Sequence, residues 1–507
     1  MTSSALALGA FKSAVVLACA SFALLGAWVA PETPGPQRGT GAGGETRSLE
    51  GDWLLTEDVY GNALHQRLTL KMEGTTLSGM LGRRSINGTV SGNAIRFAIK
   101  NDDATDEFNG DVSAVGMTGT HVHTDKYQQN PEKTSWSARR VPPKRAGPPQ
   151  HHELVPTTFY RQFSASNPPV LHVWPGDTVH TTTVDAGGTD EKGVTRVLGG
   201  NPQTGPFYVE TALPGDVLVV HLTRVRLNRD WAISDDGIVG RALDQDLAVK
   251  MKDGFKPVRW RLDRQRGLAM PEQPPAHLTS FAVPTRPMLG CVAVATGFGS
   301  APPPTGDSGR FGGNMDFNEI VEGATVYLPV AQPGALLYIG DGHAAQGDGE
   351  LNGNALETSM DVEFTVDLVP NKALMTPRVE SPTHIMTVGL GGTLEDALRA
   401  ATAGLGQWLE QDYNLSSSEI AIVLGSSVEY TLGEVADRNA AVAAKLRKDR
   451  LTFSKVVTRP PSSLLSVELP STIGRGSGPE WKPKNYWSCV RKSTKERHTR
   501  GVSGKSA

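Results

Sequence analysis

Cysteine is scarce in this chain, which has only Cys19, Cys291 and Cys489 among 507 residues. Cys19 lies in an N-terminal apolar segment and Cys489 in a basic C-terminal stretch, so no disulfide framework is visible. Cys291 lies in the apolar run GCVAVATGFG. We expect a buried packing thiol there, because cysteine is among the residue types most often buried. Its apolar neighbours predict a high thiol pKa, which argues against a catalytic thiol.

A strong net charge is also missing. The formal net charge is -3 and charged residues make up 20% of the chain, which argues against general nucleic-acid binding. The sequence contains no G-x-S-x-G elbow, Walker loop, H-E-x-x-H pair or C-x-x-C pair. Serine-hydrolase, P-loop, helical zinc-protease and dithiol redox chemistry are therefore poorly supported.

Glycine and proline, by contrast, are abundant, with 56 and 34 residues. This composition favours many short strands joined by turns over long helices. The length predicts two or three domains, and 38% hydrophobic residues indicate a soluble globular protein. We expect a mainly β fold with α/β elements, made of a small N-terminal antiparallel barrel and a large β-rich domain.

The first 30 residues read as a signal peptide or a membrane anchor. Lys12 precedes about 18 mainly apolar residues. Trp28 and Val29 interrupt the small-x-small pattern of a signal-peptidase cleavage site, so an uncleaved membrane anchor remains the alternative. We expect an exported protein, periplasmic or extracellular, that is either released or anchored. Residues 31–48 are rich in Pro and Gly and predict a disordered linker.

Residues 49–140 predict the small barrel. RLTLKM and IRFAIK alternate apolar and polar positions, and NGTVSG between them is a turn signal. The unit resembles the lipocalin-like β-barrel modules found beside bacterial enzymes. His121 and His123 in GTHVHTD would point the same way on a strand. A metal pair is conceivable there, but we favour two solvated strand residues.

Residues 153–450 predict the large domain. Pro-Gly-Asp turns at 175–177 and 214–216 sit between alternating runs, which indicates β-hairpins. Residues 459–507 are basic and rich in Pro, Gly and Ser, and we expect a disordered tail.

Two helices are expected late in the large domain. TLEDALRAATAGLGQWLEQDYN begins with Thr393 as the expected N-cap. Its leucines near one face are Leu394, Leu398, Leu405 and Leu409. The second candidate helix is SSSEIAIVLGSSVEYTLGEVAD, which we expect to pack on the first.

The run YIGDGHAAQGDGELNGNALETSM, residues 338–360, concentrates acids and a histidine among glycines. These residues are Asp341, His343, Asp348, Glu350 and Glu357. Carboxylates with one imidazole suit a divalent metal: the nitrogen ligand favours zinc, and the oxygens allow calcium or magnesium. A bound metal lowers the pKa of water from 15.7 towards about 7, which would support hydrolysis. The alternative is a loop held by Asx turns, with His343 a satisfied structural histidine.

Three stretches together resemble the acetamidase/formamidase family. They are NPQTGPFYVETALPGDVLVV, the segment from FGGNMDFNEIVEG to GDGHAAQGDGE, and GNALETSMDVEFTV. The G-D-G-H-A-x-Q-G-D-G-E block is the most specific part, and the likeness covers roughly residues 153 to 450. It implies a β-rich, commonly homo-oligomeric protein that hydrolyses short linear amides to acid and ammonia with a divalent metal.

The resemblance also implies roles for individual residues. The expected metal ligands are Asp185, His343, Glu357 and Asp316. The expected catalytic residues are Glu350, for proton transfer, and Asp341. The expected substrate-binding residues are Glu210 and Gln346, whose amide can donate and accept hydrogen bonds at once.

The chain departs from the family pattern at two places near the expected pocket rim. The family usually continues the DA pair into a GGQ-like loop, whereas this chain has DAGGTDEKG. The family usually has a glycine after the glutamate of GPFYVE, whereas this chain has Thr211. The substrate can therefore differ from formamide or acetamide. A second hypothesis remains open: an exported binding or scaffold protein that keeps the amidase fold without catalysis.

Overall fold

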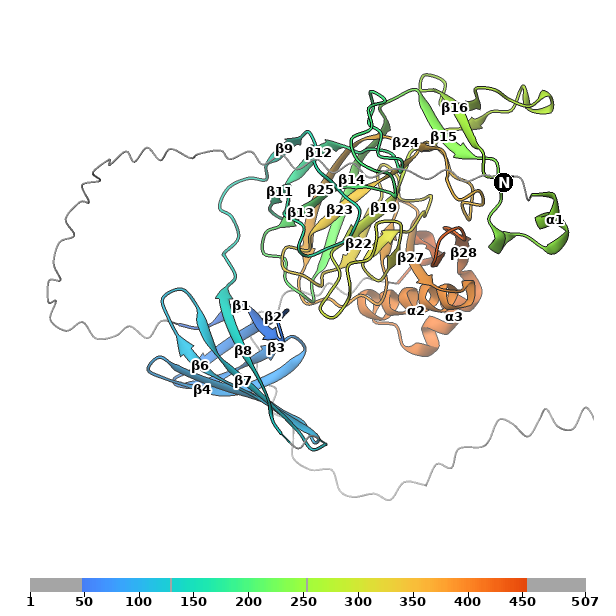
Figure 1. The fold of residues 1–507 in the computed structure, drawn as a ribbon. Coiled ribbons are helices and arrows are strands. Elements are labelled where there is room, and N and C mark those ends of the chain that lie inside the picture. The colour runs from blue at the N-terminus through green and yellow to red at the C-terminus, as the bar shows by residue number, and fades with distance from the viewer. Residues whose placement is uncertain (1–47, 128–129, 252–253, 454–507) are drawn as a thin grey trace, which may run out of the picture. The chain divides into compact units, whose positions relative to one another are not determined.

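The computed structural model describes residues 48–127, 130–251 and 254–453, and the chain divides into two compact units, Met1–Pro143 and Lys144–Ala507 (Figure 1). The predicted export segment and basic tail, and nearly all of the predicted linker, lie outside the described residues. Among the helices that are described, none is long and apolar enough to cross a membrane.

The first unit is a closed barrel of eight antiparallel strands, as predicted. Its strands in order are β1 (Gly51–Val59), β2 (Asn62–Glu73), β3 (Thr76–Leu81), β4 (Arg84–Ser91), β5 (Ala94–Lys100), β6 (Ala104–Val112), β7 (Met117–Asp125) and β8 (Glu132–Arg140). Each strand pairs with the next, and β8 closes on β1. The alternation of buried and exposed residues predicted from IRFAIK is confirmed, because Ile95, Phe97 and Ile99 are all buried in the barrel core.

A charged cluster lies inside the barrel around His121. The Nδ1 atom of this ring is 2.7 Å from Glu57 Oε1, and its Nε2 atom is 3.2 Å from Asp106 Oδ1. The ring also stacks on Phe108, with centroids 4.2 Å apart. His123 bonds the same carboxylate, with Nδ1 2.6 Å from Asp106 Oδ1. The expectation of two solvated histidines is wrong for His121, which is buried and bonded on both nitrogens.

This cluster gives the barrel a pH-dependent stability. Burial of His121 opposes its charge, but the hydrogen bonds and charges of Glu57 and Asp106 outweigh burial and raise the pKa of His121. A raised histidine pKa contributes stability that is complete below the unfolded value of about 6.5 and is lost as pH rises through the folded value. The same pairing lowers the pKa of Glu57 and of Asp106 against the effect of burial, so their contribution is lost towards acid pH.

We therefore expect His121→Gln to destabilise the barrel more at pH 6 than at pH 8.5. The loss at pH 6 should be about 1.5–3 kcal/mol, the range for hydrogen bonds to charged groups. Calorimetric unfolding of the full chain at both pH values checks this, with the exposed His277→Gln as the matched control. An equal loss at both pH values would contradict the assignment of a charged His121.

The second unit is built on two sheets. The nine-stranded sheet runs in the order β28 (Glu429–Leu432), β29 (Ala440–Arg447), β27 (His384–Gly391), β26 (Arg378–Glu380), β22 (Thr325–Pro329), β14 (Val217–Leu227), β25 (Met360–Val369), β12 (Thr178–Thr182) and β9 (His151–Leu154).

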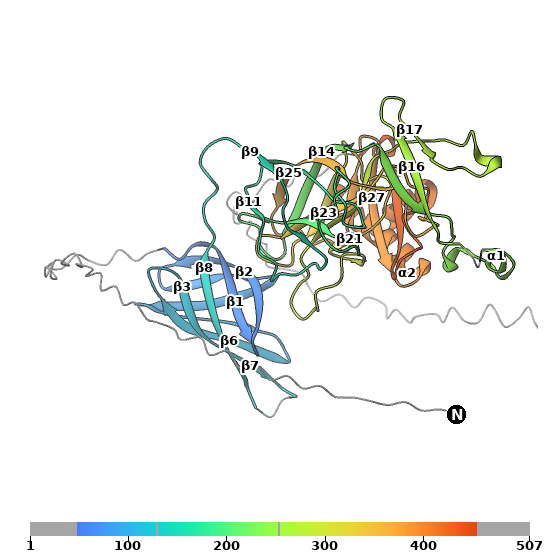
Figure 2. The same cartoon turned by 45° about the horizontal axis from the view of Figure 1, so that its top comes forward.

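The second sheet has twelve strands. Its main path is β18 (Val283–Pro284), β17 (Leu268–Pro271), β16 (Pro257–Asp263), β15 (Trp231–Asp235), β24 (Glu357–Thr358), β23 (Leu337–His343), β19 (Met288–Val294), β21 (Gly312–Asn314) and β20 (Ser308–Gly309). Off this path, β13 (Gln203–Val209) pairs with β23 and carries β10 (Phe159–Tyr160) and β11 (Leu171–Val173). In Figure 2, β16 and β17 lie at one end of the unit.

The main core lies where the two sheets face each other. It combines Val220 on β14 and Phe364 on β25 of the nine-stranded sheet with Val292 on β19 and Ile339 on β23 of the twelve-stranded sheet. The glycine-rich acidic run begins within β23, a strand that is buried along its whole length, and Asp341 and His343 are therefore placed inside the sheet.

Helices pack on the other face of β27 and β29. They are α2 (Leu394–Tyr413) and α3 (Ser417–Ser427), which Figure 1 shows side by side. The short helices elsewhere in the unit are α1 (Gln245–Lys250), η1 (Gly240–Ala242), η2 (Ala276–Leu278) and η3 (Lys448–Arg450). Thr393 caps α2 as predicted.

The buried face of α2 includes Leu405, Trp408 and Leu409, whereas Leu394 and Leu398 are exposed. The predicted extent of the second helix is wrong. The second helix ends at Ser427, and the chain then forms β28 because Glu429–Leu432 pairs with β29.

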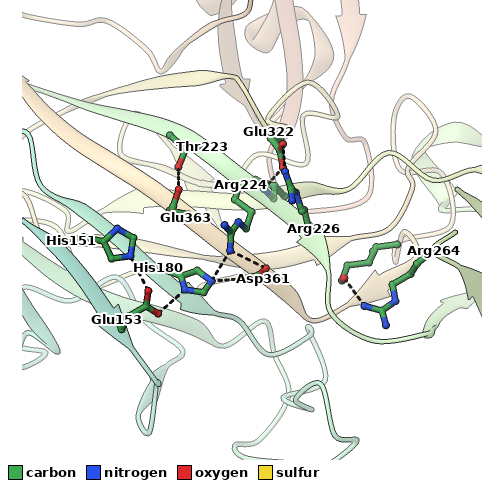
Figure 3. A network of polar contacts seen from close by, with 12 residues as sticks. His151, Glu153, His180, Thr223, Arg224, Arg226, Arg264, Glu322, Asp361 and Glu363 are labelled. Carbon is green, nitrogen blue, oxygen red and sulfur yellow. Dashed lines mark hydrogen bonds and ion pairs between the residues drawn. The ribbon is translucent and has the colours of Figure 1, made fainter.

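The outer face of β9, β12, β25 and β14 carries a network of cross-strand polar pairs (Figure 3). His180 lies at its centre, with Nδ1 2.6 Å from Glu153 Oε2 and Nε2 2.6 Å from Asp361 Oδ1. Arg226 pairs with Glu322 at 3.0 Å at the edge of this network. These outward residues alternate with inward Val179, which is the pattern of a sheet with one solvated face.

Candidate active site

The glycine-rich acidic run lies at the end of β23, inside the twelve-stranded sheet. Asp341 and His343 are two residues apart on this strand, so they face the same side. Glu357 on β24 is the cross-strand partner of His343. Asp316 follows β21 and is held by its backbone N–H, which donates to the carbonyl of Gly290 on β19 at 3.1 Å. Strand pairing therefore gathers groups that are distant in sequence.

These groups surround the Nε2 atom of His343. It lies 3.2 Å from Glu357 Oε1, 3.3 Å from Asp341 Oδ1 and 3.9 Å from Asp316 Oδ1. Three sets of ligand-type atoms each lie within 4.8 Å of one another. Two include His343, with Asp316 and Asp341 or with Glu350 and Glu357, and the third is Asp316, Glu434 and Asp437. His343 and Asp316 are fully buried at 0% exposure.

Gln346 orients the imidazole from behind. Its Nε2 donates to the carbonyl of Asp316 at 2.5 Å and to that of Gly433 at 3.1 Å. Its Oε1 must then accept from His343 Nδ1, at 2.8 Å. The His343 Nδ1 atom carries a proton, and Nε2 faces the carboxylates. Gln346 was expected to bind substrate, but its polar atoms are used in holding His343.

The donor set fits a divalent cation. His343 Nε2, Asp316 Oδ1 and Glu357 Oε2 are buried atoms without a hydrogen-bond partner among the described residues. Ligands bonded to one zinc ion at about 2.0–2.2 Å lie roughly 3–3.5 Å apart, close to the separations seen around Nε2. One nitrogen with several carboxylate oxygens also suits this ion.

The carboxylates perturb one another electrostatically. Burial raises the pKa of Glu350 to about 8 against the pull of the His343 charge, and the like charges of Glu357 and Asp341 add to the rise. Burial and the Asp341 charge likewise raise the pKa of Glu357 to about 7, although His343 opposes them. The pKa of Asp341 is lowered despite burial, because the charge of His343 favours its ionised form.

Gly290 provides the room in which Asp316 and Asp341 meet. A Cβ atom at this position would overlap Asp316 Oδ1 and Asp341 Oδ2. The next residue is Cys291, a fully buried free thiol as predicted, whose pKa is raised well above its usual range by burial and by these two acids.

An amide layer supports the acids on one side. Asn314 Nδ2 donates to Asp316 Oδ2 at 2.6 Å and to Asp437 Oδ2 at 2.9 Å, and Asn201 donates to Asn314 Oδ1. The backbone N–H of Asp437 donates to Glu434 Oε2 at 3.0 Å. Sequence reasoning missed Glu434 and Asp437, because it placed both in the second helix.

A cleft of about 610 Å³ opens over the cluster. Asp341, Glu350 and Glu357 line it together with Asp437, Asp185 and the apolar side chains of Trp231 and Ile233. Asp316 and His343 are buried and are not part of this lining.

Asp185 lines the cleft but is not among the grouped ligand atoms of the described residues. Its Oδ2 is 2.6 Å from Arg229 NH2, and its Oδ1 accepts from the Thr189 backbone at 2.8 Å. Arg229 is buried, and it also donates to the carbonyl of Glu357 at 3.2 Å. The structure thus places Asp185 in a buried ion pair that supports the site, where the sequence predicted a metal ligand. Arg229 was missed, because nothing local in its sequence marks it.

Other expected site residues lie elsewhere. Glu210, the second expected substrate-binding residue, accepts from His172 Nδ1 at 2.8 Å and is not part of the cleft lining. Its neighbour Thr211, at φ 68°, is likewise absent from the lining, so the expectation that it touches the pocket rim is wrong. Asp348 is exposed and accepts from Asn318 Nδ2 at 2.8 Å, as a loop residue does.

Known proteins resemble the second unit. A model of the Acetamidase/Formamidase family matches residues 235–448. An acetamidase of Mycolicibacterium smegmatis is 31% identical over 143 residues, which is 28% of this chain and 33% of that protein. The chain spans less than half the length of the curated relatives it matches.

Solved structures extend this likeness over more of the unit. A predicted acetamidase/formamidase of Thermoanaerobacter tengcongensis is 27% identical with a TM-score of 0.52, covering 60% of this chain and 97% of that one. An acetamidase of Yersinia enterocolitica is 29% identical with a TM-score of 0.51, covering 60% and 94%. These matches confirm that the large unit resembles the acetamidase/formamidase family, as read from the sequence.

We expect Gly290→Ala to disrupt the acidic cluster. The added methyl group must displace Asp316 or Asp341, and overpacking of this kind costs about 1–3 kcal/mol. Thermal unfolding and metal content measured by mass spectrometry check the effect, with Gly425→Ala in α3 as the control because open space surrounds that position. Unchanged metal content and stability in Gly290→Ala would contradict the role given to this glycine.

Proposed function

We propose that this protein is a metal-assisted amidase that hydrolyses the C–N bond of linear amides to a carboxylic acid and ammonia. The observation that carries the proposal is the open Nε2 atom of His343, surrounded by buried carboxylates at a cleft. The likeness of the large unit to a family whose matched relatives are named acetamidases supports the same reaction.

His343, Asp341 and Glu357 would hold the cation, because both carboxylates lie within 3.3 Å of His343 Nε2, with Asp316 as a further ligand. A bound divalent ion polarises a carbonyl group and lowers the pKa of its water towards about 7. The donor set favours zinc, and its several oxygens leave calcium or magnesium open. Gln346 keeps Nε2 aimed at this position by fixing the imidazole through Nδ1.

Glu350 is suited to move a proton during the reaction. It lines the cleft, and its Oε1 accepts from the backbone N–H of Ala355 at 2.9 Å, which fixes its position. Its pKa, raised by burial to about 8, lets the carboxyl hold a proton near neutral pH. In hydrolysis the water oxygen bonds to the carbonyl carbon while the C–N bond breaks. Glu350 in its ionised form would accept the water proton, and in its protonated form it would give that proton to the leaving nitrogen, which departs as ammonia.

The purified chain should release ammonia from formamide or acetamide and lose that activity on chelation. His343→Ala should lower kcat/KM about a thousandfold, since it removes a ligand worth several kcal/mol. An ammonia assay with and without added Zn²⁺ measures both effects. His172→Ala is the matched control, because that histidine is exposed and outside the cleft.

A folded protein that releases no ammonia from any amide, with or without metal, would contradict this proposal. Saturable binding of a sugar or peptide by such a protein would favour the alternative of an exported binding or scaffold protein. Export itself stays a prediction from the N-terminal sequence.

Gln346→Leu should weaken cation binding by about 10–100-fold, the usual cost of removing a partner that orients a ligand. The change keeps the size of the side chain but removes the acceptor for His343 Nδ1. Titration of the metal-free protein with Zn²⁺ measures the affinity directly. An affinity equal to that of the unaltered chain would show that Gln346 does not position the imidazole.

A further inference from the structure

An apolar wall stands directly beside the acidic cluster. Trp231 and Ile233 are two residues apart on β15, so their side chains face the same side of the sheet. Ile233 is the cross-strand partner of Glu357, which places the two side chains about 4.5–5.5 Å apart at Cβ. Both apolar residues line the cleft, and Ile233 keeps 38% of its surface exposed.

This wall is held firmly in place. The guanidinium carbon of Arg229 lies 3.4 Å from the centre of the Trp231 ring, and that of Arg259 lies 4.4 Å from it. Arg229 is itself fixed by the ion pair with Asp185. An indole held by two cations in this way keeps one orientation.

Further apolar side chains lie behind the lining at Gly353, although they are not part of the lining itself. Gly353 is part of the lining, and a Cβ atom at this glycine would lie 3.3 Å from Val239 and 4.0 Å from Phe255. Phe255 is 51% exposed although it is large and apolar. The cleft therefore has an acidic part and an apolar part next to each other.

The cleft is far larger than the smallest amides. Acetamide would occupy on the order of 100 Å³ if each of its few heavy atoms takes the share of a water molecule, about 30 Å³. The cleft measures about 610 Å³, a volume typical of sites for ligands of drug size. Formamide or acetamide would leave Trp231 and Ile233 in contact with water.

We propose that the substrate is an amide whose acyl group is larger and more apolar than acetyl, and that Ile233 and Trp231 select it. This inference rests on the proposed amidase function and adds a substrate class to it. The carbonyl and nitrogen would lie at Asp341, Glu350 and Glu357, and the acyl group would extend along the wall. Burying that group removes apolar surface from water on both partners, which favours its binding.

The test compares ammonia release from formamide, acetamide, hexanamide and benzamide by the full-length, metal-loaded chain. We expect kcat/KM for hexanamide to exceed that for acetamide by tenfold or more. Ile233→Ala should lower the ratio of hexanamide to acetamide kcat/KM by about tenfold, because a few methyl groups of contact are lost. Ile422→Ala is the matched control, an exposed isoleucine on α3 outside the cleft.

The outcomes separate this inference from the amidase proposal. Hydrolysis of acetamide with no gain for hexanamide or benzamide overturns the inference and leaves the amidase intact. A gain with acyl size that Ile233→Ala and Ile422→Ala affect equally overturns the role of the wall. If no amide is hydrolysed, the amidase proposal fails. Calorimetric titration of the chain with each amide then still tests whether the wall binds the acyl group. That role is refuted if hexanamide binds no tighter than acetamide.

Discussion

The site depends on one electrostatic constraint, the burial of four carboxylates around a single imidazole. Removing even one ionised carboxylate from water is costly unless a partner compensates it. Here strand pairing forces Asp341, His343 and Glu357 together, and the turn after β21 adds Asp316. Protons and the His343 charge share the compensation, and in the proposed function a bound cation joins them and makes this part of the sheet the reactive centre.

Among the described residues, the buried histidines His121 and His343 show what separates a ring with no free nitrogen from one that is open to a ligand. In the barrel, both ring nitrogens of His121 are bonded to carboxylates, so the ring has no atom left for a ligand. In the large unit, Gln346 occupies one nitrogen of His343 and leaves the other unpartnered among acids. A histidine among carboxylates therefore has no free ring nitrogen in the barrel, whereas in the large unit one ring nitrogen is available to a ligand.

The sequence was sufficient for features that repeat locally. The period of two in IRFAIK placed the barrel core, and the glycine-rich run with the family likeness identified Asp316, Asp341, His343 and Glu357, which the structure brings together. Partners that meet through long-range pairing were not visible. Arg229 meets Asp185 across 44 residues, and Gln346 reaches the carbonyl of Gly433 across 87. The helical reading of residues after Ser427 failed because pairing with β29 decides their conformation.

The order of the strands also bears on how the chain folds. In the barrel every strand pairs with its neighbour in sequence apart from the closing pair, so most of its contacts are local. In the large unit β13 pairs with β23 and β12 with β25, across more than a hundred residues. Local pairings form early, and distant ones must wait for loop closure. During synthesis from the N-terminus the barrel can therefore be complete while the acids of the cleft are still hydrated and far apart, and the reactive centre is among the last parts of the molecule to exist.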